Sequence, residues 1–489
     1  MVEDIDFKIV YPNIPIQKYL IFGERIRLAL ESAEVCKAGE LLTIFLGNCS
    51  DSLSQSIHSE LSDTEYGIFC EGNKIVLAGF LAAGIERDCQ RFIDDISNVA
   101  KDAEKFYPDG FVFREKYYLW EPTLPAPEFI SKIGVYNCGD DKYSLCYRAV
   151  KGAFEKYIKA LTDASFLVVA QNAVNFNTLC VLERDGLTVY VNYHPRRCVL
   201  NISVTTRAYS LPSYTCEKEV CGYVLAQVWV KIGMGYVIRL RDGSFIIIDS
   251  GHTIDSERII ETLNQLDVLK KAKFKITAWI ITHAHVDHYN GILMLAEKYS
   301  DQFDVRQFIY NIPDDSETVG YQVLDKRFNH VFPKALEQFG NPSVYKPHTG
   351  EKFDLDDIHI EVLYTHEDMF SEYLNEMNDT STVLMMTIKS NKILFAGDIY
   401  SRGADILVSY YENNLKCDYL QVPHHGYQNG GNAIFYKYCA PKVAMIPMSG
   451  TVQGKSSINK TIGDLDVAGC RNILVTNQDI VKNILIELD

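Results

Sequence analysis

The sequence predicts a multidomain α/β protein, with small α+β blocks ahead of a larger C-terminal α/β block. Three observations support this class. The chain has 489 residues, which is more than one hydrophobic core usually serves. From about residue 221 onward, apolar runs of strand length alternate with amphipathic stretches of helical period. Several of these runs, such as "KILFAGD" and "YLQVPHHG", are short and end in polar or small residues.

Turn and linker signals divide the chain into three blocks. Residues 1–118 are predicted to form a small α+β domain, which resembles the non-catalytic N-terminal domains of some carbohydrate-active enzymes. The proline-rich connector "EPTLPAPEF" separates it from a second small α+β domain at 128–212, where Asp185-Gly186 predicts a tight hairpin turn. The third block, 217–489, holds the motifs that carry chemistry. We expect the first two blocks to be accessory domains that bind a protein or carbohydrate partner.

Composition narrows the class of protein. No apolar run approaches the roughly 18 residues of a membrane span, so no membrane segment is expected. The acidic, proline-broken N-terminus lacks the pattern of a signal peptide, which indicates a cytoplasmic protein. The 13 cysteines are scattered without a CxxC pair, as is typical of reduced, buried thiols. A net charge of −16 repels polyanions and disfavours nucleic acid as the partner.

The stretch "WIITHAHVDHYNG" predicts a metal centre. In an extended segment, residues two apart point the same way, so His283 and His285 can hold one ion. The chain then turns into a predicted helix, which redirects Asp287 and His288 toward a second ion. Imidazole and carboxylate ligands without a thiolate suit zinc first, with manganese or iron as alternatives. We therefore expect two divalent metal ions.

These residues resemble the metallo-β-lactamase superfamily, whose signature is HxHxDH before a glycine-containing helix start. Roughly residues 220–489 carry the resemblance, and three later marks agree in order. "IIIDSG" puts Asp249 where the family has a structural aspartate. "LFAGD" puts Asp398 where it has the aspartate that bridges two metals, and "VPHHG" puts His424 and His425 at its late metal-ligand position. The resemblance implies an αββα sandwich with the metals in a cleft along one edge.

Many family members have a third histidine on the first metal, between HxHxDH and the bridging aspartate. His366, at a predicted strand end before two acidic residues, could line the cleft, or it could be a plain strand-end residue. His194, before a proline in a predicted turn of the second block, is interpreted as a surface histidine. The other histidines of the interval have no ligand role in this prediction: His330, His348 and His359.

The segment "MNDTSTVLMM" narrows the resemblance. It looks like the branch that includes the C-terminal domain of competence DNA-uptake proteins and the phosphorylcholine esterases. In that branch an N-x-x-S-x-V segment stands where others supply the third histidine, and here it places Asn378, Asp379 and Ser381 near the site. The first metal would then have fewer protein ligands and be more open to water or substrate.

The resemblance implies a metal-dependent hydrolase that uses a metal-bridged hydroxide, and it favours a phosphoesterase or phosphodiesterase acting on a small-molecule or phosphoester substrate. Asp287 would ligate and orient the attacking water, and Asp398 would bridge the ions. The carry-over puts His425 on the second metal and makes His424 the candidate proton donor, although sequence leaves open which of the two ligates. The alternatives are a nuclease of the DNA-uptake type, a lactonase or thioesterase, and a non-catalytic metal-binding sensor.

Overall fold

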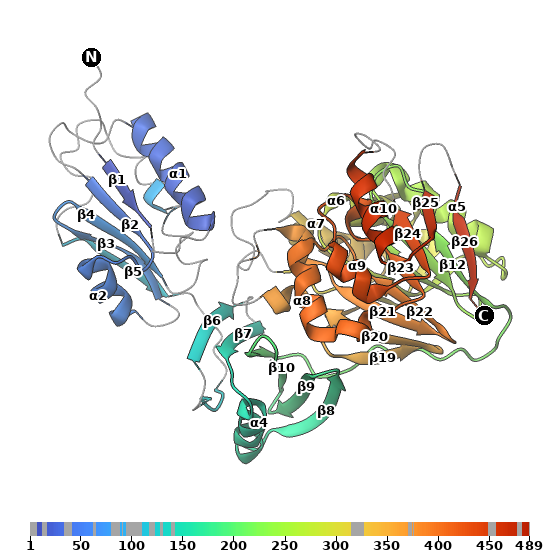
Figure 1. The fold of residues 1–489 in the computed structure, drawn as a ribbon, viewed down its shortest axis with the longest axis horizontal. Helices are drawn as coiled ribbons and strands as arrows, with labels where there is room; N and C mark the ends of the chain where they lie inside the picture. The colour runs from blue at the N-terminus through green and yellow to red at the C-terminus, as the bar shows by residue number, and fades with distance from the viewer. Residues whose placement is uncertain are drawn as a thin grey trace. The chain divides into compact units, whose positions relative to one another are not determined.

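The computed structural model describes residues 7–11, 17–33, 42–61, 65–79, 89, 91–93, 110–116, 123–127, 131–137, 142–313, 327–369, 374, 376–447, 456–476 and 482–488. Contacts divide the chain into two compact units, one made mostly of residues 1–123 and the other mostly of residues 145–489 (Figure 1). None of the helices in these described ranges has the length and apolar character needed to cross a membrane.

The N-terminal unit contains a five-stranded sheet in the order β1-β2-β4-β3-β5. Its core joins the sheet to helix α1 through the buried side chains of Phe22, Ile26 and Leu30. Asp51 accepts a hydrogen bond from the backbone N–H of Leu53 and so caps helix α2. The elements are β1 (Phe7–Val10), α1 (Gln17–Ala33), β2 (Leu42–Leu46), α2 (Ser52–Glu60), β3 (Glu65–Glu71), β4 (Lys74–Gly79) and β5 (Val112–Lys116).

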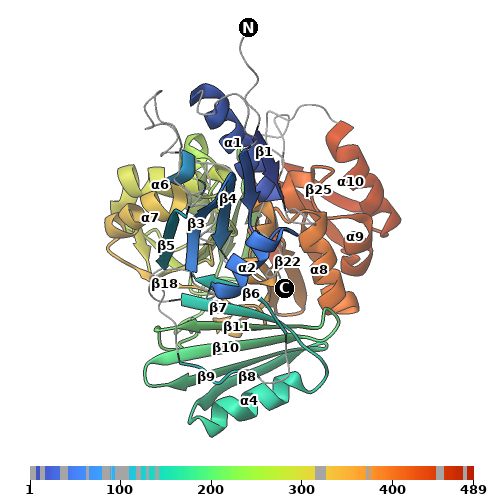
Figure 2. The same ribbon diagram turned by 90° about the vertical axis from the view of Figure 1, so that its left-hand side faces the viewer.

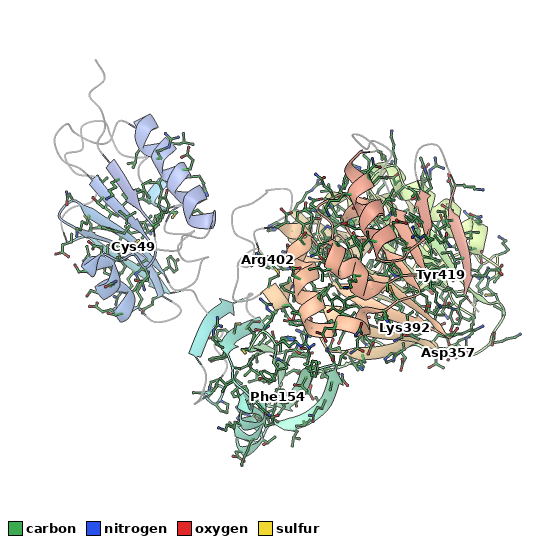
Figure 3. All side chains as sticks on the ribbon, viewed as in Figure 1. Cys49, Phe154, Asp357, Lys392, Arg402 and Tyr419 are labelled. Atoms are coloured by element: carbon green, nitrogen blue, oxygen red, sulfur yellow. The ribbon has the colours of Figure 1, made fainter. Side chains whose placement is uncertain are left out.

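The second block forms a six-stranded sheet in the order β6-β7-β11-β10-β9-β8, with helix α4 packed on it (Figure 2). Phe154 of α4, labelled in Figure 3, stacks on Tyr193 of the sheet with ring centroids 6.2 Å apart. The predicted hairpin turn is confirmed, because Asp185 and Gly186 have φ of +49° and +78° between antiparallel strands. The elements are β6 (Ser131–Asn137), β7 (Lys142–Arg148), α4 (Ala153–Asp163), β8 (Leu167–Val174), β9 (Asn177–Arg184), β10 (Leu187–His194) and β11 (Val199–Thr205).

The first sheet of the C-terminal block is buried on both faces. Its strands "FIIID" and "FKITAWI" are nearly continuous apolar runs, as expected for parallel strands covered on both sides. Ile247 faces a core shared with the helices α5, α6 and α7, whereas Ile246 and Ile248 face the second sheet. The elements are β12 (Tyr223–Gln227), β13 (Gly235–Arg239), β14 (Phe245–Asp249), α5 (Ser256–Leu266), β15 (Phe274–Ile280), α6 (Val286–Tyr299), β16 (Phe303–Val305), β17 (Gln307–Ile309), α7 (Arg327–Gln338), β18 (Ser343–Tyr345) and β26 (Ile484–Leu488).

The second sheet has seven strands in the order β19-β20-β21-β22-β23-β24-β25 and is covered by α8, α9 and α10 (Figure 1). Ile360, Leu384 and Phe395 of this sheet pack against the first one. The predicted αββα sandwich is therefore confirmed. The elements are β19 (Lys352–Leu355), β20 (Ile358–Tyr364), β21 (Val383–Ile388), β22 (Asn391–Phe395), α8 (Ser401–Tyr411), β23 (Tyr419–Gln421), α9 (Ala433–Cys439), β24 (Val443–Pro447), α10 (Ser456–Val467) and β25 (Asn472–Thr476), with short 3-10 turns η3 (His366–Met369), η4 (Met377–Thr380) and η6 (Pro423–Gly426).

The second block is joined to the sandwich by polar side chains. The prediction that His194 lies on the surface is wrong: its ring is fully buried and stacks on Tyr410 with centroids 4.0 Å apart. A second ring pair stacks Tyr190 on His348 at 3.8 Å. Side-chain N–H groups of the second block also donate to backbone carbonyls of the sandwich at Gly350, Tyr410, Thr349, Asp368 and Glu367; the donors are Asn172, Asn175, Asn177, Asn192, Arg197 and Asn201.

The domain boundaries of the sequence prediction stay predictions. Those at 118 and 128 lie outside the described residues. The segment between 212 and 217 is tied to the second sheet, because the carbonyl oxygen of Tyr214 accepts from the N–H of Asp356 at 2.6 Å. The N–H of Cys216 donates to the Asp356 carboxylate at 3.3 Å. This segment is thus held at its middle rather than free of contacts.

Candidate metal centre

The predicted ligand residues lie where buried strands end. β15 ends at Ile280 and α6 begins at Val286, so the motif occupies the turn between them. β14 runs parallel beside β15 and ends at Asp249. In the other sheet, β22 and β23 are also parallel and lead into Asp398 and η6. Since parallel strands end at the same edge of a sheet, the fold gathers these polar residues along one edge of the sandwich.

Asp398 lies at the middle of the gathered residues. Its Oδ2 is 3.1 Å from Nε2 of His288 and 3.0 Å from Nε2 of His425. Nε2 of His425 is also 3.4 Å from Oδ2 of Asp287. Two groups of three side chains, His283-His288-Asp398 and Asp287-His288-His425, have ligand atoms within 4.8 Å of one another. The two groups share His288, so the two ion positions they would define are adjacent.

His283 and His285 are next to each other, as alternation along an extended segment predicts. Nε2 of His283 is 3.1 Å from Nδ1 of His285. His283 belongs to the group with His288 and Asp398, whereas His285 lies outside both groups. Of the four HxHxDH residues, His285 alone belongs to neither group of converging ligand atoms.

Two buried hydrogen bonds orient the histidines. Oδ2 of Asp249 lies 2.7 Å from Nδ1 of His288, and the same carboxylate accepts from the N–H and the hydroxyl of Thr282. The carbonyl oxygen of Pro447 lies 3.0 Å from Nδ1 of His425. A partner on Nδ1 fixes the proton there and turns the Nε2 lone pair toward an ion, which is how metal-ligating histidines are usually held.

The backbone separates the two adjacent histidines. His424 and His425 have φ of +48° and +54°, in the left-handed region. His425 is buried and faces Asp398, whereas His424 is half-buried and its Nδ1 lies 2.8 Å from Oδ1 of Asn429. The His424 ring lies between Tyr400 and Tyr427, with centroids 4.9 and 5.0 Å away. The structure therefore brings His425, and not His424, into the ligand groups.

The residues of the "MNDTSTV" segment hydrogen-bond to the backbone around Asp398 and at the start of α8. The hydroxyl of Ser381 accepts from the N–H of Asp398 at 3.0 Å and donates to the carbonyl of Asn378 at 2.8 Å. A Cβ on Gly397, whose φ is +56°, would come within 2.7 Å of the Ser381 side chain, so glycine is needed there. Oδ1 of Asp379 accepts from the N–H groups of Tyr400 and Gly403 at the start of α8. Asp379 thus caps a helix.

The remaining histidines lie outside both ligand groups. His366 is buried in η3, where its Nδ1 lies 2.9 Å from the carbonyl oxygen of Asn311. His348 is buried against Glu367, with Nδ1 to Oε2 at 2.8 Å. His359 is half-buried on β20 beside Asp354, on the face that its alternation predicts, and His330 is exposed on α7. Among the described residues, none of these four completes a three-residue group with His283 and His285.

The charges at the centre are strongly coupled. Burial alone would raise the pKa of Asp398, but His288 and His425 outweigh it and hold this pKa well below its usual range. The pKa of Asp287 is also lowered. Burial would raise it, but the charge of His288 outweighs burial. Burial opposes charge on His425, yet Asp398 and Asp287 raise its pKa to about 10. An incoming cation therefore displaces protons, so its affinity should rise with pH.

The donor set fits divalent metal ions. Nε2 of His425 and Oδ1 of Asp398 are buried and make no hydrogen bond within the described part of the chain; the 3.0 Å approach of Nε2 to Oδ2 lacks the angles of one. Such atoms carry a cost unless a ligand satisfies them. Imidazole and carboxylate ligands without a thiolate suit zinc, manganese or iron.

Comparison with known proteins identifies the sandwich. Residues 229–446 match the family model of the metallo-beta-lactamase superfamily. This part of the chain is a metallo-β-lactamase superfamily domain. The resemblance drawn from HxHxDH and the later strand-end motifs is confirmed at the level of the superfamily. No curated protein gives a significant sequence match.

Solved structures show distant likenesses to the chain. A diiron β-hydroxylase from Streptomyces venezuelae aligns at 13% identity and a TM-score of 0.35, covering 56% of this chain and 55% of that one. Human tRNase Z, short form, aligns at 15% identity and a TM-score of 0.30, covering 55% of this chain and 99% of that one. A flavodiiron protein from Giardia intestinalis aligns at 13% identity and a TM-score of 0.24, covering 58% of this chain and 57% of that one. The chain spans about half the length of the hydroxylase, and these likenesses carry no functional argument.

Sequence reasoning missed several residues of the metallo-β-lactamase domain. Thr282 directly precedes the motif and holds Asp249, and its position beside His283 was the available signal. Tyr400 follows Asp398 by two residues and packs on His424, so its place after a strand end could have marked it. The Pro447 carbonyl left no signal, since any residue can supply a backbone oxygen.

Asp379 gives a prediction on pH and stability. Burial raises the pKa of its carboxyl to about 6, above the value near 3.9 expected in the unfolded chain. The folded state thus holds this proton more tightly, and the resulting stability is present below about pH 4 and lost as pH rises through about 6. Asp379→Asn keeps a neutral acceptor. Urea denaturation of metal-free protein measures this effect. Between pH 4 and 7, the free energy of unfolding of wild type should fall by up to about 3 kcal/mol relative to that of the variant. Parallel stability curves would contradict this.

Proposed function

We propose that this chain is a metal-dependent hydrolase and that its substrate is a phosphoester, with a phosphodiester as the first candidate. The supporting observation is the convergence of His283, Asp287, His288, Asp398 and His425 into two adjacent groups with ligand atoms within 4.8 Å. The preference for phosphoesters comes from the likeness of the "MNDTSTV" and "HHG" segments to the phosphorylcholine esterase branch. It is therefore an inference by analogy.

In this proposal the ligands divide between two sites. His283 would hold one ion together with His285, although His285 lies outside the two groups of converging ligand atoms. Asp287, His288 and His425 would hold the other ion, and Asp398 would serve both. When bound, two divalent ions supply a water that ionises near neutral pH and positive charge opposite the reacting oxygen. The chain itself supplies rigidity. For example, Ser381 fixes the backbone of Asp398, with Oγ to N at 3.0 Å.

His424 is the proposed residue for the proton of the leaving oxygen. Its Nδ1 faces Asn429, so Nε2 is the nitrogen left for a substrate. With one proton on the ring and Asn429 accepting it, Nε2 carries a lone pair. Donation from Nε2 therefore needs a second proton on the ring. Burial opposes that proton and lowers the pKa of the His424 imidazole, although the charge of Asp398 favours it.

Metal analysis combined with one hydrolysis assay tests the proposal. Purified protein supplemented with zinc or manganese should hold close to two ions per chain and cleave a chromogenic aryl phosphodiester, and chelation should abolish the activity. Absence of bound metal would contradict the metal centre itself. If the protein binds metal but cleaves only lactones or thioesters, the proposed phosphoester substrate is wrong and one of these takes its place. Preferential cleavage of DNA would identify a nuclease, and metal without any hydrolysis would favour a sensor.

A further inference from the structure

The second block holds the turn η3 by its backbone. Nη1 of Arg197, in the turn between β10 and β11, donates to the carbonyl oxygen of Asp368 at 2.8 Å. The side-chain amide of Asn201, on β11, donates to the carbonyl oxygen of Glu367 at 3.3 Å. Two successive residues of η3 are therefore fixed by side chains of the second block.

The Asp368 carboxylate ties the same turn to the sandwich. Its side chain is buried, and Oδ2 accepts from the hydroxyl of Thr349 at 2.5 Å and from the N–H of Thr365 at 2.9 Å. Oδ1 lies 3.3 Å from Nε2 of His194 in the second block. A buried polar group with several partners has little freedom to shift, so η3 and the residue that follows β20 are held together.

Further contacts lead from η3 to the metal centre. η3 packs against η4. The hydroxyl of Tyr364, the last residue of β20, donates to the carbonyl oxygen of Asp379 in η4 at 2.6 Å. Ser381, directly after η4, accepts the N–H of Asp398 at 3.0 Å through its hydroxyl. A continuous series of contacts thus joins the second block to the backbone of the residue that lies at the middle of the ligand groups.

We propose that the second block positions the metal centre: Arg197 and Asn201 hold η3, and η3 and η4 hold the backbone of Asp398. This inference rests on the metal centre of the proposed function and is independent of its substrate. Ligands that are held in place before an ion arrives need less ordering when it binds, so the ion binds more tightly. Arg197 and Asn201 are positioning residues, since they act through η3 and η4.

Arg197→Met and Arg197→Lys test the inference in the whole chain. The first removes the guanidinium and keeps an unbranched stem, whereas the second keeps a cationic donor on such a stem. Cobalt(II) is titrated into metal-free protein, because its visible absorption reports both occupancy and ligand geometry. Arg197→Met should bind cobalt about 2–10-fold more weakly, the equivalent of one hydrogen bond, with an altered spectrum. Arg197→Lys should restore the wild-type affinity and spectrum.

Asn172→Ala is the matched control. Asn172 also donates from the second block to a backbone carbonyl of the sandwich, at 3.2 Å, but the acceptor is Gly350 and lies outside η3. The metal-free proteins of Asn172→Ala and Arg197→Met should unfold at similar temperatures, since each loses a contact of the same interface. The cobalt affinity of Asn172→Ala should stay at the wild-type level.

The outcomes separate this inference from the proposed function. Wild-type cobalt affinity and spectrum in Arg197→Met would overturn the positioning role, as would an equal loss of affinity in Asn172→Ala. If Arg197→Met does not fold, Asn201→Ala, which removes only an amide, enters the same comparison. A wild-type chain that binds no cobalt contradicts the metal centre and this inference together. If wild type binds cobalt but cleaves no phosphoester, only the proposed function fails.

Discussion

Replacing His425 with alanine is expected to lower metal content and hydrolysis together. Its Nε2 lies 3.0 Å from Asp398 and 3.4 Å from Asp287, and Nδ1 is held by the Pro447 carbonyl. Removing the ring takes away one of three ligands of a group and leaves two carboxylates facing each other. Elemental analysis should therefore show a fall from about two ions toward one per chain, and turnover on the aryl phosphodiester should drop below detection.

His424→Ala should behave differently, because this ring points to Asn429, Tyr400 and Tyr427 instead of the carboxylates. Metal content should stay near that of wild type, and turnover should fall by about 10²–10⁴-fold, the usual contribution of general acid catalysis. The loss should shrink for leaving groups that need no proton. His359→Ala, on the exposed side of β20, controls for loss of a histidine as such. If His424→Ala strips metal while His425→Ala does not, the assignment is reversed.

Separating residues 217–489 from the rest of the chain is expected to destabilise the metallo-β-lactamase domain strongly. The cut removes the six side-chain donors named above, which reach backbone carbonyls of the sandwich. It also removes the rings of Tyr190 and His194, which stack on His348 and Tyr410. A hydrogen bond contributes about 0.5–1.5 kcal/mol net, against a total stability of about 5–15 kcal/mol for a domain. The loss is therefore a large fraction of the whole.

Thermal unfolding and metal analysis of two fragments check this expectation. Residues 217–489 should unfold at a lower temperature than residues 124–489, which keep the second block, and should aggregate more readily because the buried rings become exposed. Equal unfolding temperatures and equal metal content in the two fragments would contradict the expected dependence. The second block would then be an accessory domain, as its sequence suggests.

The parts of the fold that were predicted correctly depend on local chemistry. Asp185-Gly186 adopts positive φ because a two-residue hairpin loop requires it, and these residue types tolerate it. The HxHxDH residues follow a strand whose apolar run is visible in "FKITAWI". Asp249 and Asp398 were placed by order along the chain, and the structure brings both to His288.

The parts that were missed depend on contacts between distant segments. Asn192 donates to the carbonyl of Thr349, 157 residues away, and no pattern in either segment marks the pair. His194 precedes a proline, as a surface turn residue often does, but the sandwich covers it with Tyr410. The sharing of His288 between two ligand groups also depends on how the two sheets meet, which neither sheet encodes alone.

The left-handed backbone at η6 has a consequence for sequence choice. Three successive residues, His424, His425 and Gly426, have φ of +48°, +54° and +80°. A residue with a side chain pays about 1–2 kcal/mol in this conformation, and only glycine escapes the cost. Glycine at 424 should therefore relieve this backbone cost, while it removes the ring that the proposed function uses for proton transfer. Under the proposed function, stability and activity therefore conflict at this turn, because the two histidines occupy a backbone conformation that residues with side chains disfavour.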